Sequence, residues 1–534
     1  MTEGGQSLPG SPAVVPVARA EWLLAFRLLS PLPILLLAML ALRCWVAGRT
    51  DLEADEAYYW LWSRQLAPSY FDHPPMVAYL IRLGTSLFGD TIPGLRSMAI
   101  LAMIVSSALV YALALILFDN RRTGLLAVLW FNMMPLTAFF SIILFPDTPA
   151  VMFWLLSCVG LGLVWRCGRG EWWYLIGAAT GLLLLSKYTG IFLVAGIAAW
   201  LLLSAEMRPW LARREPYIAA LIALIIFSPV ILWNARHGWV SFGKQFGRAM
   251  DVSAEGGLAN MLGFVGTQAA FVSPLIFAFS VAGVAVAAVR GWRSQEASWL
   301  LLALSCAPML LYFLIHALSA EVLPNWPSAA YPAAVVAAVG AFSPATGSPR
   351  RYWIGLSFQA APWVGLALTL ILCTQMTMQP MPIAAARDPL NRFAGWAGLS
   401  SETRAVANAQ GATYVATNDY GLNAALAFYL RDLTVFQTSE SIRYASLPPV
   451  DQALLARGAG IYVTTLALDD FPRMQKYFDS VELIATIWRS RKGDPIEPYR
   501  IYSLKGYRGG LPSAPVVPTR LTLRDGHAAA MQSG

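Results

Sequence analysis

The sequence predicts a polytopic helical membrane protein that ends in a small α/β domain. Of its 534 residues, 57% are hydrophobic and 13% are charged, whereas soluble domains carry about 25% charged residues. Apolar runs long enough to cross a bilayer follow one another as far as about residue 376, with short loops between them. Beyond that point hydrophobicity drops and mixed helix and strand patterns begin.

Composition argues against several other classes of protein. The net charge is +8, but the arginines are scattered in pairs between apolar runs and form no continuous basic stripe, so no nucleic-acid partner is expected. No glycine-rich phosphate loop is present in the sequence. The five cysteines have no metal-ligand spacing, and we expect neither a zinc site nor a disulfide framework.

We expect about eleven spans, since each needs roughly 17–25 mostly apolar residues. They are placed at residues 23–47, 96–118, 123–143, 148–165, 172–186, 189–204, 217–234, 261–289, 298–316, 327–342 and 353–376. With the N-terminus in the cytoplasm, every inner loop contains at least two arginines, as the positive-inside rule requires. These are Arg121, Arg122, Arg166, Arg169, Arg208, Arg213, Arg214, Arg290, Arg293, Arg350 and Arg351.

The segment 172–205 decides this topology, because it is short for two spans and long for one. A single span there would place all later arginine pairs outside. The sequence therefore predicts a tight hairpin, whose turn at residues 186–188 lies below the outer membrane surface.

The span count divides the chain into four parts. We expect a cytoplasmic tail at residues 1–22 and a transmembrane domain at residues 23–376, with a first outer loop at residues 48–95. A soluble extracytoplasmic α/β domain at residues 377–508 and a disordered tail at residues 509–534 follow. Within the α/β domain the pattern predicts strands at Thr413–Thr417, Ile461–Thr465 and Tyr499–Leu504 and a helix at Leu422–Leu430.

The polar side chains that are costly near a membrane collect in the predicted outer loops. Ionisable groups in such places are hypotheses of function by default. The first loop contributes Asp55, Glu56, Tyr58, Tyr59, Asp72 and His73; the later loops contribute Asp147, then Lys187 and Tyr188, then Arg236 and His237, and finally Glu321, Asn325 and Trp326.

Each of these groups also has a structural explanation. Asp55 can solvate the start of an interfacial helix, Asp147 can cap a helix, and Lys187 can reach the outer headgroups. Arg236 and His237 fit a solvated loop, and the tryptophans and tyrosines fit an interfacial aromatic belt. Anchoring alone does not explain why five separate outer loops offer acid, base or amide groups, so the set predicts a site on the outer face.

Six motifs carry a resemblance to a known family. In order they are D-E-A-Y-Y-W, Y-F-D-H-P-P, F-P-D-T-P, L-S-K-Y-T-G, N-A-R-H-G-W and N-W-P. This set resembles the bacterial members of the protein mannosyltransferase and aminoarabinose transferase superfamily over about residues 50–340, and it extends to Tyr420–Leu430. The resemblance implies the GT-C fold in the bacterial inner membrane, with the active site and the C-terminal domain facing the periplasm.

The resemblance also implies a reaction. Such enzymes take a sugar from a polyprenyl-phosphate carrier and transfer it to lipid A, lipopolysaccharide core, another glycolipid or protein. We expect no cofactor beyond the donor and no metal, because Lys187 and Arg236 could support the leaving phosphate. Asp55 matches the catalytic aspartate of the first loop, Glu56 its partner and Asp147 the acid of the second outer turn. Lys187 resembles the lysine that contacts the donor phosphate.

One position departs from the aminoarabinose transferases. They have a lysine where this chain has His73, so a fixed positive charge becomes a titratable one. The subgroup with D-H-P-P and N-W-P includes transferases that add galacturonic acid to lipopolysaccharide, which is the specific identity that the resemblance suggests.

The residue types suit glycosyl transfer. An acceptor hydroxyl needs a carboxylate to take its proton, for which we choose Asp55. The departing phosphate needs electrostatic support, which Lys187 and Arg236 can supply. Glu56, Asp147 and Asn325 would then orient the sugar or the acceptor.

Three other classes of protein remain open. A transporter or flippase for lipid-linked sugars should carry its charged groups near the bilayer midplane and show repeat symmetry, whereas here they lie at the outer ends of the spans. A polymerase of lipid-linked units would share an outer site, but a long outer loop between late spans would be expected. A membrane scaffold leaves the polar set of the five loops unexplained.

Overall fold

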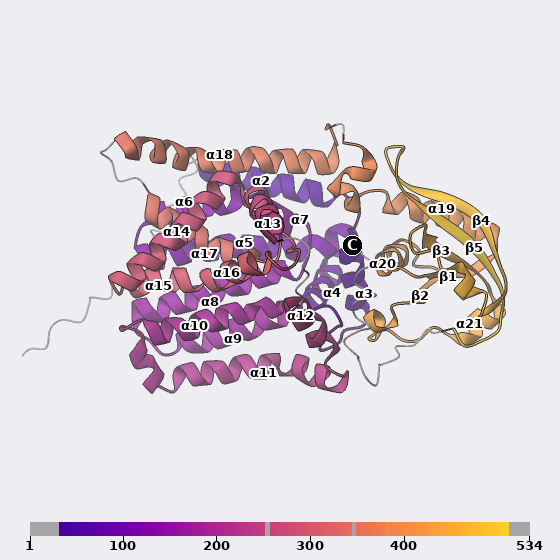
Figure 1. Ribbon diagram of the computed structural model, residues 1–534, viewed down its shortest axis with the longest axis horizontal. Helices are drawn as coiled ribbons and strands as arrows, with labels where there is room; N and C mark the ends of the chain where they lie inside the picture. Colours follow the sequence, from indigo (N-terminus) through magenta and orange to yellow (C-terminus); the bar gives the residue numbers. More distant parts are fainter. Residues whose placement is uncertain (1–30, 251–256, 344–348, 382, 512–534) are drawn as a thin grey trace, which may run out of the picture.

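The structure is a computed structural model that describes residues 31–250, 257–343, 349–381 and 383–511. The predicted cytoplasmic tail and nearly all of the predicted C-terminal tail lie outside these residues. The helices form a long bundle, and a sheet lies at one end of it (Figure 1). This sheet end of the bundle is the end that carries the candidate site.

The bundle consists of helices that follow the predicted spans closely. They are α2 Pro31–Ala47, α5 Ile92–Phe118, α6 Arg121–Met133, α7 Pro135–Ile142, α8 Asp147–Cys167, α9 Trp172–Ser186, α10 Ile191–Leu203, α11 Glu215–Arg236, α13 Gly257–Val272, α14 Pro274–Arg293, α15 Ala297–Leu304, α16 Ala307–His316, α17 Tyr331–Phe342 and α18 Pro349–Thr377. Three further helices lie toward the sheet end: α3 Ala54–Arg64, α4 Met76–Phe88 and α12 Val240–Met250.

Among the described residues, six helical segments are long and apolar enough to cross a membrane. They comprise α5, α8, α11, α14, the segment Ala297–His316 and the part of α18 from Tyr352, and a bent seventh span results if α6 and α7 count as one. Shorter apolar helices occupy most of the other predicted spans. The structure therefore supports a multi-pass protein, and the count of about eleven spans stays a prediction.

The predicted hairpin at residues 172–205 is confirmed. Helix α9 ends at Ser186 and α10 begins at Ile191, after a short 3-10 turn. A Cβ added to Gly177 would lie 2.5 Å from the carbonyl oxygen of Ala219, and one added to Gly181 would lie 3.1 Å from the Cα atom of Ala223. The contacts advance in the same direction along α9 and α11, so these helices are parallel, and α10, which connects them in the sequence, runs in the opposite direction.

The predicted inner loops meet at the end of the bundle away from the sheet (Figure 1). Arg166, in the last turn of α8, lies 3.0 Å from Asp119, which follows α5. The rings of Phe118 and Trp299 lie 5.1 Å apart, which brings the start of α15 to the same place. The predicted inner and outer loops thus lie at opposite ends of the bundle.

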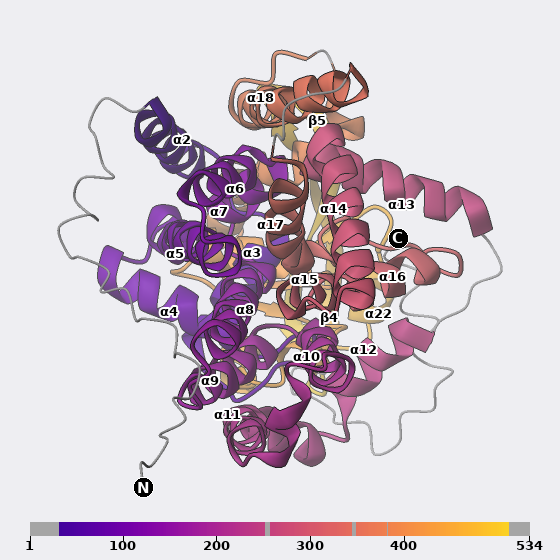
Figure 2. The same cartoon turned by 90° about the vertical axis from the view of Figure 1, so that its left-hand side faces the viewer.

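The predicted continuous span at residues 261–289 is wrong. The chain breaks at Ser273, whose φ is 82°, between α13 and α14. Proline at position 274 has no N–H and disfavours a helical conformation in the residue before it, which accounts for the break. Helix α13 is seen end-on in Figure 1 and from the side in Figure 2, so it lies across the bundle while α14 runs along it.

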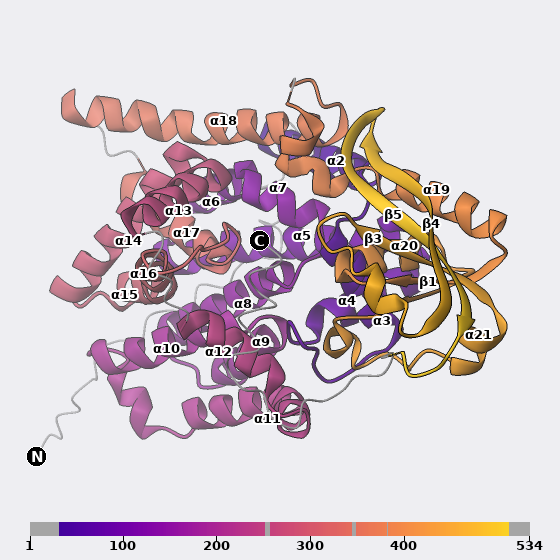
Figure 3. The same cartoon turned by 45° about the vertical axis from the view of Figure 1, so that its right-hand side comes forward.

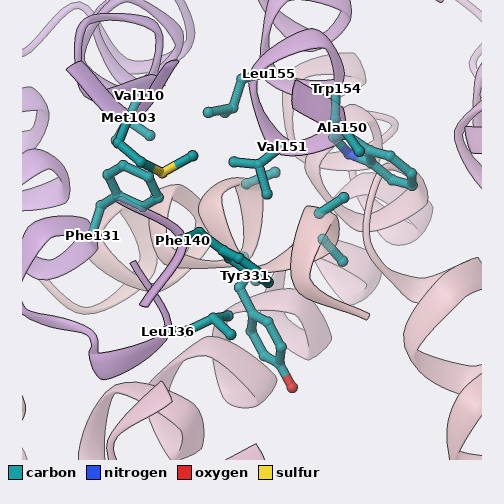
Figure 4. Packing of buried hydrophobic residues seen from close by; sticks show 14 of the residues in the cluster. Met103, Val110, Phe131, Leu136, Phe140, Ala150, Val151, Trp154, Leu155 and Tyr331 are labelled. Atoms are coloured by element: carbon teal, nitrogen blue, oxygen red, sulfur yellow. The ribbon is translucent and has the colours of Figure 1, made fainter. Parts of the chain in front are cut away.

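The predicted span at residues 123–143 is bent rather than straight. Helices α6 and α7 meet at 68° because Pro135 interrupts the helical hydrogen bonding. The carbonyl groups left open by the break are bonded elsewhere: Arg43 donates to the carbonyl oxygen of Asn132 at 2.6 Å, and Thr369 donates to that of Met133 at 3.1 Å. Side chains of both helices then pack against α5, α8 and α17 in the core (Figure 4).

The residues after α18 build a five-stranded sheet. Its strands are β1 Ala412–Thr417, β2 Thr434–Gln437, β3 Ala459–Thr465, β4 Phe478–Arg491 and β5 Asp494–Tyr507, in the order β2-β1-β3-β5-β4. The pairs β1/β2 and β1/β3 are parallel, whereas β5 is antiparallel to both β3 and β4. The three predicted strands lie within β1, β3 and β5, and β2 and β4 were not predicted.

Helices pack on the sheet, and one of them joins it to the bundle. Helix α19, Trp396–Ala409, packs on β4, and α21, Gln452–Arg457, packs on β5. The predicted helix at 422–430 corresponds to α20, Tyr420–Tyr429. Helix α20 lies between α3 and the strands β1 and β2 (Figure 3), so residues near position 420 come next to the first loop.

Candidate active site

A cavity of about 1020 Å³ lies at the sheet end of the bundle. Ten of the fourteen predicted site residues line it, namely Asp55, Tyr58, Tyr59, Asp72, His73, Asp147, Lys187, Tyr188, Asn325 and Trp326. They come from four of the five predicted outer loops. The fold thus brings together residues that are far apart in the sequence.

The cavity has two kinds of wall. Aromatic and aliphatic side chains make up the first, including Phe139, Ile191, Phe192, Phe227, Phe242, Phe246, Phe271 and Phe313. Charged and phenolic side chains make up the second, including Asp55, Asp72, Lys244, Arg392, Tyr420 and Arg443. Such a cavity suits an amphiphile with a long apolar chain and a polar head.

Helix α3 presents three carboxylates at its start, and the sequence explains its shape. Glu53 caps the helix by accepting from the Asp55 N–H at 2.6 Å, while Glu56 accepts from the Glu53 N–H at 3.3 Å. This reciprocal pair is a capping box, and negative groups are favoured at a helix N-terminus.

Two of the three carboxylates are held by arginines. Glu56 is fully buried and accepts from Arg96 Nη2 at 2.5 Å and Nε at 3.0 Å. Glu53 accepts from Arg392 Nε at 2.9 Å, and burial together with the neighbouring Asp55 raises its pKa to about 8. Glu56 does not reach the cavity, so the prediction that it takes part in catalysis or orients a substrate finds no support in this geometry.

Asp55 is the carboxylate of this group that faces the cavity. Its Oδ1 accepts a hydrogen bond from the Tyr420 hydroxyl at 3.0 Å, and its Oδ2 lies 3.9 Å from Arg392 Nη2. Burial raises the pKa of Asp55, and Arg392 and Tyr420 oppose that rise. A carboxylate with a raised pKa and one open oxygen suits a general base.

Asp72 is held as an anion by cations from distant parts of the chain. Arg443 donates to its two oxygens at 2.9 and 2.8 Å, Tyr58 donates to Oδ2 at 2.9 Å, and Lys244 forms an ion pair with Oδ1. Burial alone would raise the pKa of Asp72, but Lys244 and Arg443 outweigh it and hold the pKa well below its usual range. Fixed cations therefore lie beside His73.

Asp147 anchors a second cluster on the cavity wall. It is the first residue of α8, and its carboxylate accepts from Lys187 Nζ at 2.6 Å, Ser328 Oγ at 2.9 Å and Asn325 Nδ2 at 3.1 Å. The Lys187 side chain is 9% exposed. The lysine is thus paired with Asp147, while it still lines the cavity.

The three remaining predicted residues do not line the cavity. Arg236 and Glu321 are exposed. The ring of His237 stacks on Trp233 at 4.0 Å and is hydrogen-bonded to the Trp233 carbonyl oxygen. The predicted support of a leaving phosphate by Arg236 finds no support in this geometry, because α11 contributes Phe227 to the cavity wall while Arg236, its last residue, is exposed and does not line the cavity.

In α12 and in the region after α18, five charged or phenolic residues of the site were missed from the sequence. They are Lys244, Arg392, Asp419, Tyr420 and Arg443. Only Tyr420 had a signal, since the resemblance extends to residues 420–430. The others are charged residues outside any recognisable motif. They reach the cavity only because α12 and the region after α18, called the sheet region below, pack against it.

In the part of the chain that the structure describes, no three His, Cys, Asp or Glu side chains are grouped in a way that could hold a metal ion.

Comparison with known proteins shows which families the chain resembles. The family model of dolichyl-phosphate-mannose-protein mannosyltransferases matches residues 72–233. The chain is 28% identical over 400 residues to the lipid A galacturonosyltransferase RgtD of Rhizobium johnstonii, a match that covers 72% of this chain and 78% of that one. It is 30% identical over 183 residues to the undecaprenyl phosphate-alpha-4-amino-4-deoxy-L-arabinose arabinosyl transferase of Pseudomonas paraeruginosa, which covers 32% of each chain.

Solved structures agree on the fold. ArnT from Cupriavidus metallidurans in the apo state superposes with a TM-score of 0.61 at 13% identity, over 91% of this chain and 98% of that one. The same protein bound to undecaprenyl phosphate gives 0.60 at 14% identity, with the same coverage. Together with the sequence matches, this likeness shows a multi-pass membrane glycosyltransferase with the GT-C fold, similar to the protein mannosyltransferase and aminoarabinose transferase superfamily.

Proposed function

We propose that this protein transfers a single galacturonic acid from a polyprenyl-phosphate carrier to lipid A at the periplasmic face of the inner membrane. The observation that carries the proposal is the position of Asp55, whose carboxylate faces the polar part of a cavity that also has an extended aromatic wall. The likeness to a lipid A galacturonosyltransferase over most of both chains supports the sugar and the acceptor.

The reaction follows from the groups in the cavity. The acceptor oxygen attacks the anomeric carbon opposite the phosphate, and Asp55 takes the acceptor proton. The bond from the anomeric carbon to the phosphate oxygen breaks, and polyprenyl phosphate leaves. Lys187, which is held in place by Asp147, supports the charge on the departing phosphate.

The two walls divide the donor between them. The aromatic wall takes the first isoprenyl units, and the polar wall takes the sugar. A uronate carries a carboxylate, for which arginine is the best-matched side chain. Arg392 keeps 55% of its side chain exposed and retains donors beyond those bound to Glu53, so it is our choice for the group that contacts the sugar acid.

Mass spectrometry of lipid A and core from a strain that lacks this protein tests the proposal. We expect a hexuronic acid to disappear from lipid A and to return when the wild-type protein is restored, but not when Asp55→Asn is restored at equal abundance. A missing pentosamine would replace the proposed sugar, and loss from the core alone would replace the acceptor. Unchanged lipid A and core would overturn the proposal and direct attention to another glycolipid or protein acceptor, or to transport of lipid-linked sugars.

A further inference from the structure

We infer that Tyr420, from the sheet region, is a positioning residue for Asp55. Its hydroxyl donates to Asp55 Oδ1 at 3.0 Å across 365 positions of sequence. One carboxylate oxygen is thereby occupied, and the other, Oδ2, is left to face an acceptor. This inference rests on the proposed transfer reaction with Asp55 as its base.

Tyr420 is held from several sides. Asp419 caps α20 by accepting from the Leu422 N–H at 2.6 Å, which fixes the helix start at Tyr420. The ring of Tyr420 packs edge-on against that of Tyr58, with 5.3 Å between the ring centroids, and the Arg443 guanidinium lies over the Tyr420 ring at 4.2 Å. A ring confined in this way holds its hydroxyl in one place, as positioning requires.

Close approach of two helices brings this tyrosine to the base. A Cβ added to Gly421 would lie 2.9 Å from the Cβ of Ala54, the first residue of α3. Real side chains do not approach so closely, so only glycine lets α20 lie at this distance from α3. Position 421 therefore controls the separation between Tyr420 and Asp55.

The chemical step uses the two carboxylate oxygens differently. Oδ1 stays bonded to Tyr420, and Oδ2 accepts the proton of the acceptor hydroxyl. The electron pair of that O–H bond forms the new bond to the anomeric carbon, and the pair of the broken bond leaves on the phosphate. Tyr420 neither gains nor loses a proton, because it only orients the base.

The charges around Asp55 determine what loss of the phenol does. Glu53 and Asp72 are the neighbouring acidic groups, and Arg392 and Arg443 are the neighbouring cations. Among these groups, Tyr420 donates to the ionised form of Asp55 and so lowers its pKa. Removal of the phenol hydroxyl therefore raises the pKa of the base in addition to releasing its orientation.

The test uses Tyr420→Phe in the full-length protein, in detergent or nanodiscs, with a polyprenyl-phosphate galacturonic acid donor and lipid A. We expect kcat to fall roughly 10- to 100-fold, since hydrogen bonds to charged groups contribute in this range. The donor KM should stay within about twofold, and the acid limb of the kcat/KM profile should move to higher pH. Gly421→Ala should produce a change in the same direction through displacement of α20.

Tyr444→Phe is the matched control. Tyr444 belongs to the same aromatic cluster and donates to the Tyr420 carbonyl oxygen at 2.8 Å, and no contact joins its hydroxyl to Asp55. We expect it to keep the wild-type kcat and pH profile. Equal losses in the two variants would show a packing role and overturn the inference, as would a wild-type kcat and profile in Tyr420→Phe.

Asp55→Asn separates this inference from the proposed function. If Asp55→Asn is inactive while Tyr420→Phe behaves as wild type, only the positioning role is wrong. If Asp55→Asn is fully active, the proposed base and the positioning role both fail. If the wild-type protein uses a donor other than galacturonic acid, the same variants are compared with that donor, so the result for Tyr420 does not depend on the sugar.

Discussion

Lys187 donates a hydrogen bond to Asp147 at 2.6 Å, which joins the turn after α9 to the first residue of α8. The side chains of the lysine and the aspartate are 9% and 4% exposed. Removal of one partner from a buried ion pair costs about 3–5 kcal/mol. We therefore expect Lys187→Ala to unfold at a markedly lower temperature, and Lys187→Met with Asp147→Asn to recover most of the loss.

The same double variant tests the role of Lys187 in donor binding. Because its fold is restored, a change in affinity for undecaprenyl phosphate reports the lost ammonium rather than instability. We expect weaker binding, measured by titration of the lipid into the purified variant. Unchanged affinity would remove Lys187 from the phosphate site and leave His73 as the next residue to test.

Asp55→Asn should lower turnover by roughly 10²–10⁴-fold, the range that general base catalysis contributes. The amide keeps the size of the carboxylate but cannot accept the proton. Asp432→Asn is a suitable control, because Asp432 is 63% exposed and pairs with Arg404 in the sheet region. Near-normal transfer by Asp55→Asn at equal abundance would reassign the base to Asp147 or show that none is needed.

The pH profile should reflect the burial of Asp55. An exposed aspartate has a pKa of about 3.9, and burial raises that of Asp55. The base must be ionised, so kcat/KM should fall as the pH drops through this raised value rather than near 4. A profile that stays flat down to pH 4 would contradict the assignment of Asp55 as the base.

Arg43 should contribute to stability through the break between α6 and α7. It donates to Asn132 Oδ1 at 2.9 Å and to the Asn132 carbonyl oxygen at 2.6 Å. Arg43→Met keeps the length of the side chain but leaves buried acceptors unbonded, at a cost of about 1–3 kcal/mol each. Thermal unfolding in detergent should shift downward, whereas Arg49→Met, at an exposed position in the same region, should leave it unchanged.

Reporter fusions test the orientation in the membrane. Fusions after residues 122, 168, 212, 293 and 350 should be cytoplasmic, because the arginine pairs lie there. Fusions near residues 147, 240, 322 and 400 should be exported. A cytoplasmic location for residue 400 would place the cavity on the wrong side of the membrane for the proposed reaction.

Some of this molecule was predictable because the signals are local. The apolar run lengths predicted most helices, and the arginine pairs led to the hairpin around Lys187, since both depend on burial and charge within one segment. The break at Ser273 and the bend at Pro135 were not predicted, although proline marks both. Hydropathy averages over a window and does not report where a chain turns.

The sequence by itself determined the class of protein, the end of the bundle at which the polar loops meet and ten of the residues that line the cavity. Only the tertiary structure decided which carboxylate is available. Glu53, Asp55 and Glu56 are near-equivalent in sequence, but Arg392 and Arg96 bind the first and the last, while Tyr420 leaves one oxygen of Asp55 open. Those partners come from distant parts of the chain, and a pairing across such separations depends on the packing of whole helices rather than on any local pattern.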